Sequence, residues 1–205
     1  MRALVLVDLQ YDFLPGGALA VPHGDEVIPV AQRLMPTFEL VVATQDWHPR
    51  DHKSFAANNP GAHVGDLREL NGLAQVMWPA HCVQGSRGAE LHDDLDGITQ
   101  VIQKGTNAEI DSYSGFFDNG HKKATGLEGW LREHAVTELT VLGLATDYCV
   151  KATVLDALEL RFAVTVVAEG CRAVDLHPGD GARALDQMRA AGAVISGGPL
   201  AGAQA

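Results

Sequence analysis

Three side chains of this 205-residue sequence could together perform nucleophilic catalysis: the Cys149 thiol, the Asp8 carboxylate and the Lys104 ammonium group. Each stands at or just beyond the end of a short apolar run. A thiol attacks as a thiolate, so it needs a base to take its proton and a cation to hold the charge. The three types predict a cysteine nucleophile with Asp8 as its base and Lys104 as its orienting cation. Taken singly, they have ordinary structural interpretations: a small buried apolar residue, a turn cap and a surface charge.

The position of Cys149 favours the catalytic interpretation. It directly precedes an apolar pattern of helical period over residues 150–158, which places it in the first turn of a helix. Thr146 or Asp147 could cap that helix. The positive end of a helix dipole can lower the pKa of a thiol, and free backbone N–H groups there can stabilise an oxyanion.

A second group of residues has the chemistry of a metal site. Asp46 and His48 alternate along an extended segment, so both side chains can point the same way, and His81 follows a long loop. A carboxylate with two imidazoles suits one divalent ion, zinc or iron before manganese, with positions left open for water and substrate. His52 is a possible fourth contributor, directly or through water. The Asp-x-His pair alone is a weak signal, so this prediction depends on the fold bringing His81 close.

Aromatic residues belong to the loops that would surround such a site: Phe13, Trp47, Trp78 and Tyr113. They could form the walls of a slot for a flat ring, or they could simply pack in the core.

The elements that must position these residues have the pattern of an α/β protein. Short β-branched runs without polar alternation indicate strands buried on both faces, and they alternate with helical patterns, which is typical of a mostly parallel sheet. The expected strands are 4–7, 41–43, 101–103, 140–144, 164–167 and an edge strand at 193–195. The expected helices are 127–131, 150–158, 184–191 and one with apolar positions over 27–38, which Pro36 should end. We therefore expect a three-layer α/β/α fold with about six strands. The reactive residues would then lie close together at the carboxyl edge of the sheet.

Length and composition favour a single domain over residues 1–205, because 46% hydrophobic content suits one core. The segment near 49–80 lacks a clear period and is expected to be a long functional loop insertion. The Gly-rich tail near 197–205 is expected to fray.

Charge and cysteine usage exclude several classes of function. A formal net charge of -11 would repel nucleic acid and anionic membranes, and no apolar stretch is long enough to cross a bilayer. Three widely spaced cysteines make a poor disulfide framework and leave at least one thiol free, which fits a cytoplasmic protein. We expect a small-molecule substrate, and a monomer or a homodimer.

Several short motifs together give the sequence a family resemblance, in the order DLQYDF at 8–13, QDWHP at 45–49, WPAHCV at 78–83, KG at 104–105, DSYS at 111–114 and GLATDYCV at 143–150. In order and spacing they resemble the nicotinamidases, or pyrazinamidases, of the isochorismatase-like superfamily. The resemblance extends from residue 3 to about 195. No single motif would be specific, whereas the combination is.

This resemblance implies an isochorismatase-like hydrolase fold and a reaction. The substrate would be nicotinamide, converted to nicotinate and ammonia in NAD salvage, with pyrazinamide as a further substrate. The implied roles are Cys149 as nucleophile, Asp8 as base, Lys104 as its partner, Asp46, His48 and His81 as metal ligands, and Phe13 and Trp78 flanking the ring. A cis peptide bond between Leu144 and Ala145 would turn the amides of Ala145 and Cys149 toward the oxyanion.

Other functions stay open on the sequence alone. A different amidase of the superfamily, similar to N-carbamoylsarcosine amidohydrolase, would share the cysteine, aspartate and lysine but not use the metal ligands. Isochorismatases proper lack the cysteine nucleophile. A protein of another class, a non-catalytic metal or thiol sensor, would keep a free cysteine without turning over any amide.

Overall fold

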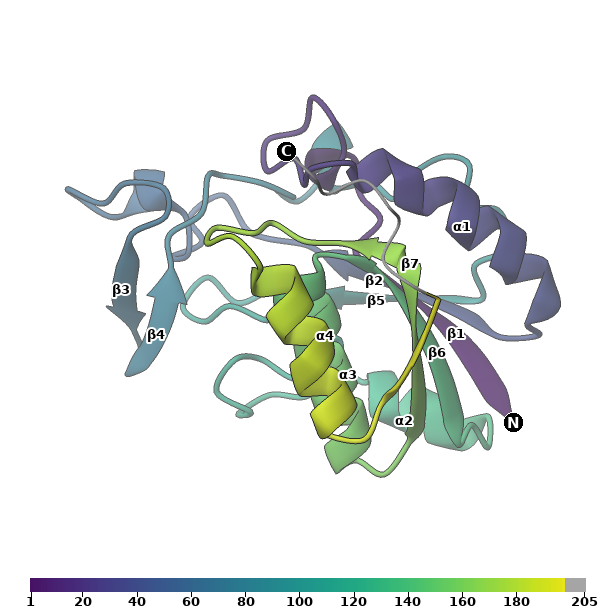
Figure 1. Cartoon of the computed structure of the whole chain (residues 1–205). Helices are drawn as coiled ribbons and strands as arrows, with labels where there is room; N and C mark the ends of the chain where they lie inside the picture. The colour runs from purple at the N-terminus through teal and green to yellow at the C-terminus, as the bar shows by residue number, and fades with distance from the viewer. Residues whose placement is uncertain (198–205) are drawn as a thin grey trace.

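A computed structural model describes residues 1–197, and its centre is one six-stranded sheet (Figure 1). The strand order is β5-β2-β1-β6-β7-β8, and every neighbouring pair is parallel. The strands are β1 (Arg2–Val7), β2 (Val41–Asp46), β5 (Gln100–Lys104), β6 (Glu138–Leu144), β7 (Ala163–Arg172) and β8 (Val194–Ser196). The expected strands, including the edge strand, are confirmed.

The central strands are buried on both faces, as their unbroken apolar runs predict. All six residues of β2 are buried, and in β1 only Arg2 is exposed. Such strands need helices on both sides, because neither face can meet water.

Helices cover both faces and make the expected three layers. They are α1 (Val27–Leu34), α2 (Leu127–Glu133), α3 (Lys151–Glu159) and α4 (Asp180–Ala190). In Figure 1, α1 lies on one face of the sheet, while α2, α3 and α4 lie together on the other. Right-handed crossovers require this division, since the chain leaves β1 toward one edge and later runs from β6 toward the opposite edge.

The reversal of direction between β1 and β6 creates the crevice in which open α/β sheets bind ligands. Asp8 directly follows β1, while Asp46 and Lys104 are the last residues of β2 and β5. Cys149 lies in the π-helical turn Thr146–Val150 that joins β6 to α3. The prediction that these residues share the carboxyl edge of one sheet is confirmed.

The long insertion contains regular structure that we did not expect. The antiparallel pair β3 (Leu67–Leu70) and β4 (Leu73–Val76) forms a hairpin that extends away from the sheet (Figure 1). Asn71 and Gly72 connect the two strands with φ angles of 52° and 79°, the left-handed turn that Asn-Gly favours between strands. The description of 49–80 as a segment without structure was therefore wrong at 67–76.

The described chain also contains short 3-10 helices at Tyr11–Phe13, Gly24–Glu26, Met35–Thr37, Ala56–Asn58 and Arg87–Ala89. The tail expected to fray lies outside the described residues from 198 onward. Among residues 1–197, no helix is long and apolar enough to cross a membrane.

Candidate active site

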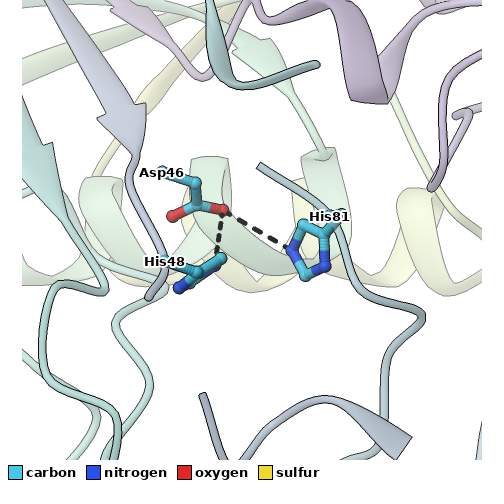
Figure 2. A group of neighbouring side chains, drawn as sticks. All are labelled: Asp46, His48 and His81. Carbon is cyan, nitrogen blue, oxygen red and sulfur yellow. Dashed lines mark ion pairs between the residues drawn. The ribbon is translucent and has the colours of Figure 1, made fainter. Parts of the chain in front are cut away.

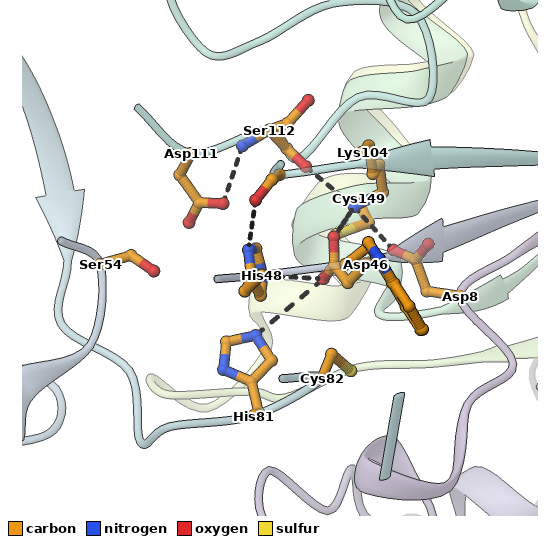
Figure 3. Close-up of polar contacts among 12 residues, drawn as sticks. Asp8, Asp46, His48, Ser54, His81, Cys82, Lys104, Asp111, Ser112 and Cys149 are labelled. Carbon is orange, nitrogen blue, oxygen red and sulfur yellow. Dashed lines mark hydrogen bonds and ion pairs between the residues drawn. The ribbon is translucent and has the colours of Figure 1, made fainter. Parts of the chain in front are cut away.

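The ammonium group of Lys104 is the centre of the site and is completely buried (Figure 3). Its Nζ lies 2.9 Å from Oδ2 of Asp8 and 2.5 Å from Oδ1 of Asp46. It also donates to the Ser112 carbonyl at 2.8 Å and lies 3.3 Å from Sγ of Cys149. Burial alone would lower the pKa of Lys104, but the two carboxylates outweigh it and hold the pKa well above its usual value. Lys104 is therefore a permanent cation, and its interpretation as a surface charge is excluded.

Asp8 is held in place by Thr44, which lies on the neighbouring strand. Oγ1 of Thr44 donates to Oδ1 of Asp8 at 2.6 Å and accepts from the Asp8 amide at 3.2 Å. Complete burial raises the pKa of Asp8 to about 6, against the opposing effect of Lys104. A carboxyl group with this pKa can accept and return a proton near neutrality.

Cys149 is buried in the turn that begins α3, with Lys104 as the cation beside its sulfur. Burial raises the pKa of this thiol well above its usual value, and Lys104 only partly opposes the shift. Our expectation of a lowered pKa was therefore wrong, because desolvation outweighs the helix terminus and the cation. The thiol rests in its protonated form and needs a base.

The expected side-chain cap of this helix is also absent. The N-cap residue of the turn is Ala145, without a side-chain cap hydrogen bond. Asp147 instead accepts hydrogen bonds from the amides of Val174 and Asp175 at 3.0 and 2.9 Å. Asp147 thus ties the loop after β7 to the turn that carries Cys149.

Asp46, His48 and His81 form a compact group from two separate segments, the end of β2 and the loop that carries His81 (Figure 2). Oδ2 of Asp46 lies 3.6 Å from Nε2 of His48 and 4.0 Å from Nε2 of His81. Nδ1 of His48 lies 2.9 Å from the Gly105 carbonyl, and Nδ1 of His81 lies 2.8 Å from the Pro79 carbonyl. Because a carbonyl can only accept, both rings carry a proton on Nδ1, and in the neutral ring the Nε2 lone pair faces Asp46. Burial works to lower the pKa of His48, but the Asp46 carboxylate outweighs it and holds the pKa above its usual value, so an ion bound there would displace a proton.

This arrangement fits a divalent metal ion. The Nε2 atom of His48 is buried and has no hydrogen-bond partner among the described residues, a cost that an ion would remove. Burial lowers the pKa of His81 to about 4, so its ring is neutral as a ligand must be. Burial works to raise the pKa of Asp46, but Lys104 and the neighbouring imidazoles hold it below its usual value, so the carboxylate is charged. One anionic oxygen and two imidazole nitrogens are the donors that zinc and iron prefer.

His52 lies beside this group rather than among its three donors. It is fully buried, and its ring centroid is 4.4 Å from that of His48. Burial and the His48 ring lower its pKa to about 4. Its ring nitrogen can instead share a second cluster with His48 and Asp111.

A pocket of about 380 Å³, including its mouth, opens over Cys149, Asp46 and His81. The expected residues that line it are Phe13, Asp46, Trp78, His81, Tyr113, Ala145 and Cys149. Trp47, the fourth expected aromatic residue, does not line it. The peptide bond between Leu144 and Ala145 is cis, as the resemblance implied.

Sequence reasoning missed other residues of the pocket. Leu19, Val21, Tyr148 and Val174 add apolar lining, and Asp111 adds a carboxylate that is only 3% exposed. Gln75 Nε2 donates to Asp111 at 3.0 Å and lies 3.0 Å from the Tyr113 hydroxyl, to which Trp78 Nε1 also donates. The available signal for Asp111 was its place in the DSYS motif, but the sequence alone assigns this aspartate no chemical role. The fold places Asp111 beside His48 and His52.

Comparisons with known proteins identify the family of the chain. The family model described as the isochorismatase domain matches residues 2–198. The nicotinamidase of Escherichia coli is 53% identical, over 95% of this chain and 93% of its own length. The structure of the Acinetobacter baumanii nicotinamidase/pyrazinamidase superimposes with a TM-score of 0.91 at 45% identity, covering 95% of this chain and 94% of that one.

The pyrazinamidase of Pyrococcus horikoshii, solved in complex with zinc, superimposes with a TM-score of 0.79 at 38% identity, covering 95% of this chain and 98% of its own. The family model covers nearly the whole chain, the relatives have this degree of identity, and the solved structures share the fold. These three findings lead to one assignment. The chain belongs to the isochorismatase family, in its nicotinamidase branch.

Proposed function

We propose that this protein is a nicotinamidase, a cysteine amidohydrolase that converts nicotinamide to nicotinate and ammonia. The observation that carries the proposal is the position of Lys104 Nζ, in contact with Asp8, Asp46 and Cys149 at once. That contact joins nucleophile, base and metal group into one site. The identity of 53% to the Escherichia coli nicotinamidase supports the choice of substrate.

Asp46, His48 and His81 would hold one divalent metal ion. Zinc is the first choice, since the similar Pyrococcus horikoshii pyrazinamidase was solved with zinc, while the donor set also suits iron and accommodates manganese. When bound, the ion would anchor the pyridine nitrogen as a Lewis acid. Phe13 and Trp78 would flank the ring, and Tyr113, fixed by Gln75 and Trp78, would close the pocket wall.

The first chemical step makes a thioester. Asp8 takes the thiol proton, and Cys149 Sγ attacks the carboxamide carbon while Lys104 stabilises the developing thiolate. The amides of Ala145 and Cys149 would hold the oxyanion. Asp8 then returns the proton to the amide nitrogen, so that the C–N bond breaks and neutral ammonia leaves.

The second step hydrolyses the thioester. Asp8, again ionised, takes a proton from water, and the resulting hydroxide adds to the acyl carbon. The C–S bond breaks, Asp8 returns its proton to the sulfur of Cys149, and the released nicotinic acid gives its own proton to solvent to become nicotinate. The cycle thus consumes one water and restores the resting thiol. Its product suits NAD salvage, and pyrazinamide, a similar ring amide, would react in the same way. We also propose that the whole chain acts as one domain.

The proposal is tested by supplying zinc-loaded protein with nicotinamide and, in parallel, with N-carbamoylsarcosine. Chromatography should detect nicotinate together with an equal amount of ammonia, and no turnover of the second substrate. Turnover of N-carbamoylsarcosine alone would instead assign the chain to the other amidase type. Turnover of neither by metal-loaded protein would refute the proposal.

A further inference from the structure

His52 has a protonation pattern opposite to that of the two metal-binding histidines. Its Nδ1 accepts a hydrogen bond from the backbone N–H of Ser54 at 3.2 Å and lies 2.7 Å from the Ser54 hydroxyl. A backbone N–H can only donate, so Nδ1 of His52 must carry a lone pair. In a neutral imidazole the proton is then on Nε2.

This tautomer makes Nε2 of His52 a donor instead of a ligand. Nδ1 of His48 and Nδ1 of His81 donate hydrogen bonds to the Gly105 and Pro79 carbonyls, which leaves Nε2 of each ring available to bind a metal ion. Nε2 of His52, by contrast, carries a proton and is buried, and no acceptor among the described residues meets it in full hydrogen-bond geometry, although the Ile110 carbonyl lies near the ring. Leaving a buried N–H without an acceptor costs free energy. A bound molecule with an acceptor atom, such as water, would remove that cost at Nε2 of His52.

Asp111 supplies a carboxyl group beside His48 and His52, held by two hydrogen bonds. Its Oδ1 accepts from the Ser112 amide at 2.7 Å (Figure 3). Its Oδ2 accepts from Gln75 Nε2 at 3.0 Å. Ligand atoms of Asp111, His52 and His48 all lie within 4.8 Å of one another. Each carboxylate oxygen keeps a further lone pair, so Asp111 can accept another hydrogen bond.

We infer that His52 and Asp111 form a donor–acceptor pair beside the metal ion and do not bind it themselves. The His52 Nε2–H donates, and the Asp111 carboxylate accepts, and together they hold a water at a position that the three protein ligands leave open. The inference rests on the proposed function, because it presumes an ion on Asp46, His48 and His81. His52 and Asp111 are thus both positioning residues for the bound ion.

Nitrogen NMR of the zinc-loaded protein tests the His52 assignment without substrate and without a variant. Long-range proton–nitrogen spectra distinguish the two imidazole tautomers and metal-bound nitrogens. The expected result is a metal-bound Nε2 for His48 and His81 and a protonated Nε2 for His52. A protonated Nδ1 or a metal-bound nitrogen on His52 would overturn the inference.

X-ray absorption of the same zinc-loaded protein counts imidazole ligands independently. Two are expected in wild type and in His52→Gln, and one in His81→Gln. Three in wild type, or a loss in His52→Gln, would show that His52 is a ligand. These readouts do not use nicotinamide, so a protein that binds zinc as described but hydrolyses no nicotinamide would refute the proposed reaction and leave this inference standing.

Chelator competition tests the role of Asp111 through metal affinity. Asp111→Asn keeps the size of the side chain but removes its charge, and we expect a loss of about 10- to 100-fold, as for other groups that support metal ligands. Asp51→Asn, an exposed residue of the same insertion, is the matched control and should leave affinity unchanged. Equal affinity in Asp111→Asn and wild type, in a protein that circular dichroism shows to be folded, would remove Asp111 from the account.

Discussion

Lys104 connects the two halves of the chemistry through a single nitrogen atom. Its ammonium group balances Asp8 and Asp46 while facing the sulfur of Cys149. Full burial makes each of these charges expensive to leave unpaired. The charge of Lys104 therefore stabilises the two carboxylates and the Cys149 sulfur together in one buried site.

Lys104→Met should therefore impair both activity and stability. Without the cation, two buried carboxylates face each other, and the free energy of unfolding should fall by about 3 to 5 kcal/mol. The rate of Cys149 alkylation by iodoacetamide should fall as well, because the thiolate loses its counterion. Urea unfolding and alkylation rates measure the two effects, with the exposed residue variant Lys122→Met as the control. Wild-type values in Lys104→Met would contradict the central position of the ammonium group.

The pKa of Asp8 predicts the pH dependence. Asp8 acts as a base only when ionised, and its pKa is raised by burial to about 6. Below that value kcat/KM should rise about tenfold per pH unit, and above it the profile should level off. The hydrogen bond from Thr44 favours the ionised form, so Thr44→Val should move the rising limb to higher pH. Thr44→Ser, which keeps the hydroxyl, should restore the wild-type profile, whereas an unmoved limb in Thr44→Val would exclude Asp8 as the titrating group.

At the scale of elements, the close approach of the Gly105 backbone fixes His48, one of the proposed metal ligands. Gly105 follows β5 with a φ of 64°, and a Cβ built there would lie 2.3 Å from the ring of His48. The glycine is needed for two reasons, conformation and space. Its carbonyl also accepts a hydrogen bond from His48 Nδ1, so the turn after β5 sets both the position and the tautomer of that ring.

Gly105→Ala should accordingly weaken metal binding by displacing His48. Gly97→Ala is a matched control, because Gly97 also has a positive φ, 92°, while nothing lies within 4 Å of the added Cβ. Both variants should lose about 1 kcal/mol of stability from backbone strain. Only Gly105→Ala should lose metal affinity in chelator competition, and equal affinities in the two would show that the ring of His48 does not depend on this contact.

The strands and their edge could be predicted from sequence because buried parallel strands leave a strong local signal. Asp8, Asp46 and Lys104 end such strands, so topology alone brings them together. Other features have no local signal. The pKa of Cys149 depends on burial by the whole fold, and Asp147 bonds to a loop 27 residues further along the chain. The hairpin did have a signal, the Asn71-Gly72 turn, which we overlooked within a polar insertion.

At the scale of the whole molecule, the proposed metal ligands come from two separate parts of the chain. Asp46 ends β2, His48 follows it, and His81 lies beyond the β3–β4 hairpin. An ion on these residues binds the folded protein alone, so mass action makes it a stabiliser of the entire fold. The oligomeric state, monomer or homodimer, stays a prediction that ultracentrifugation can test.

Metal removal should therefore lower the melting temperature, and zinc should restore it. Calorimetry should show a Tm that rises with free zinc, and the rise should vanish in His81→Gln, which removes one ligand. His63→Gln, at an exposed histidine of the same insertion, should keep the full response. A Tm independent of zinc in wild type would contradict a metal site built into the fold.

The central claim is that Cys149 hydrolyses nicotinamide, and ammonia release by the zinc-loaded protein tests it most directly. Wild type should release ammonia, while Cys149→Ala should lose at least about a thousandfold in rate. Cys82→Ala and Cys171→Ala remove the other buried thiols and should keep the activity, which separates the loss of a nucleophile from the loss of a buried sulfur. Release that persists in Cys149→Ala, or its absence in metal-loaded wild type, would contradict the account.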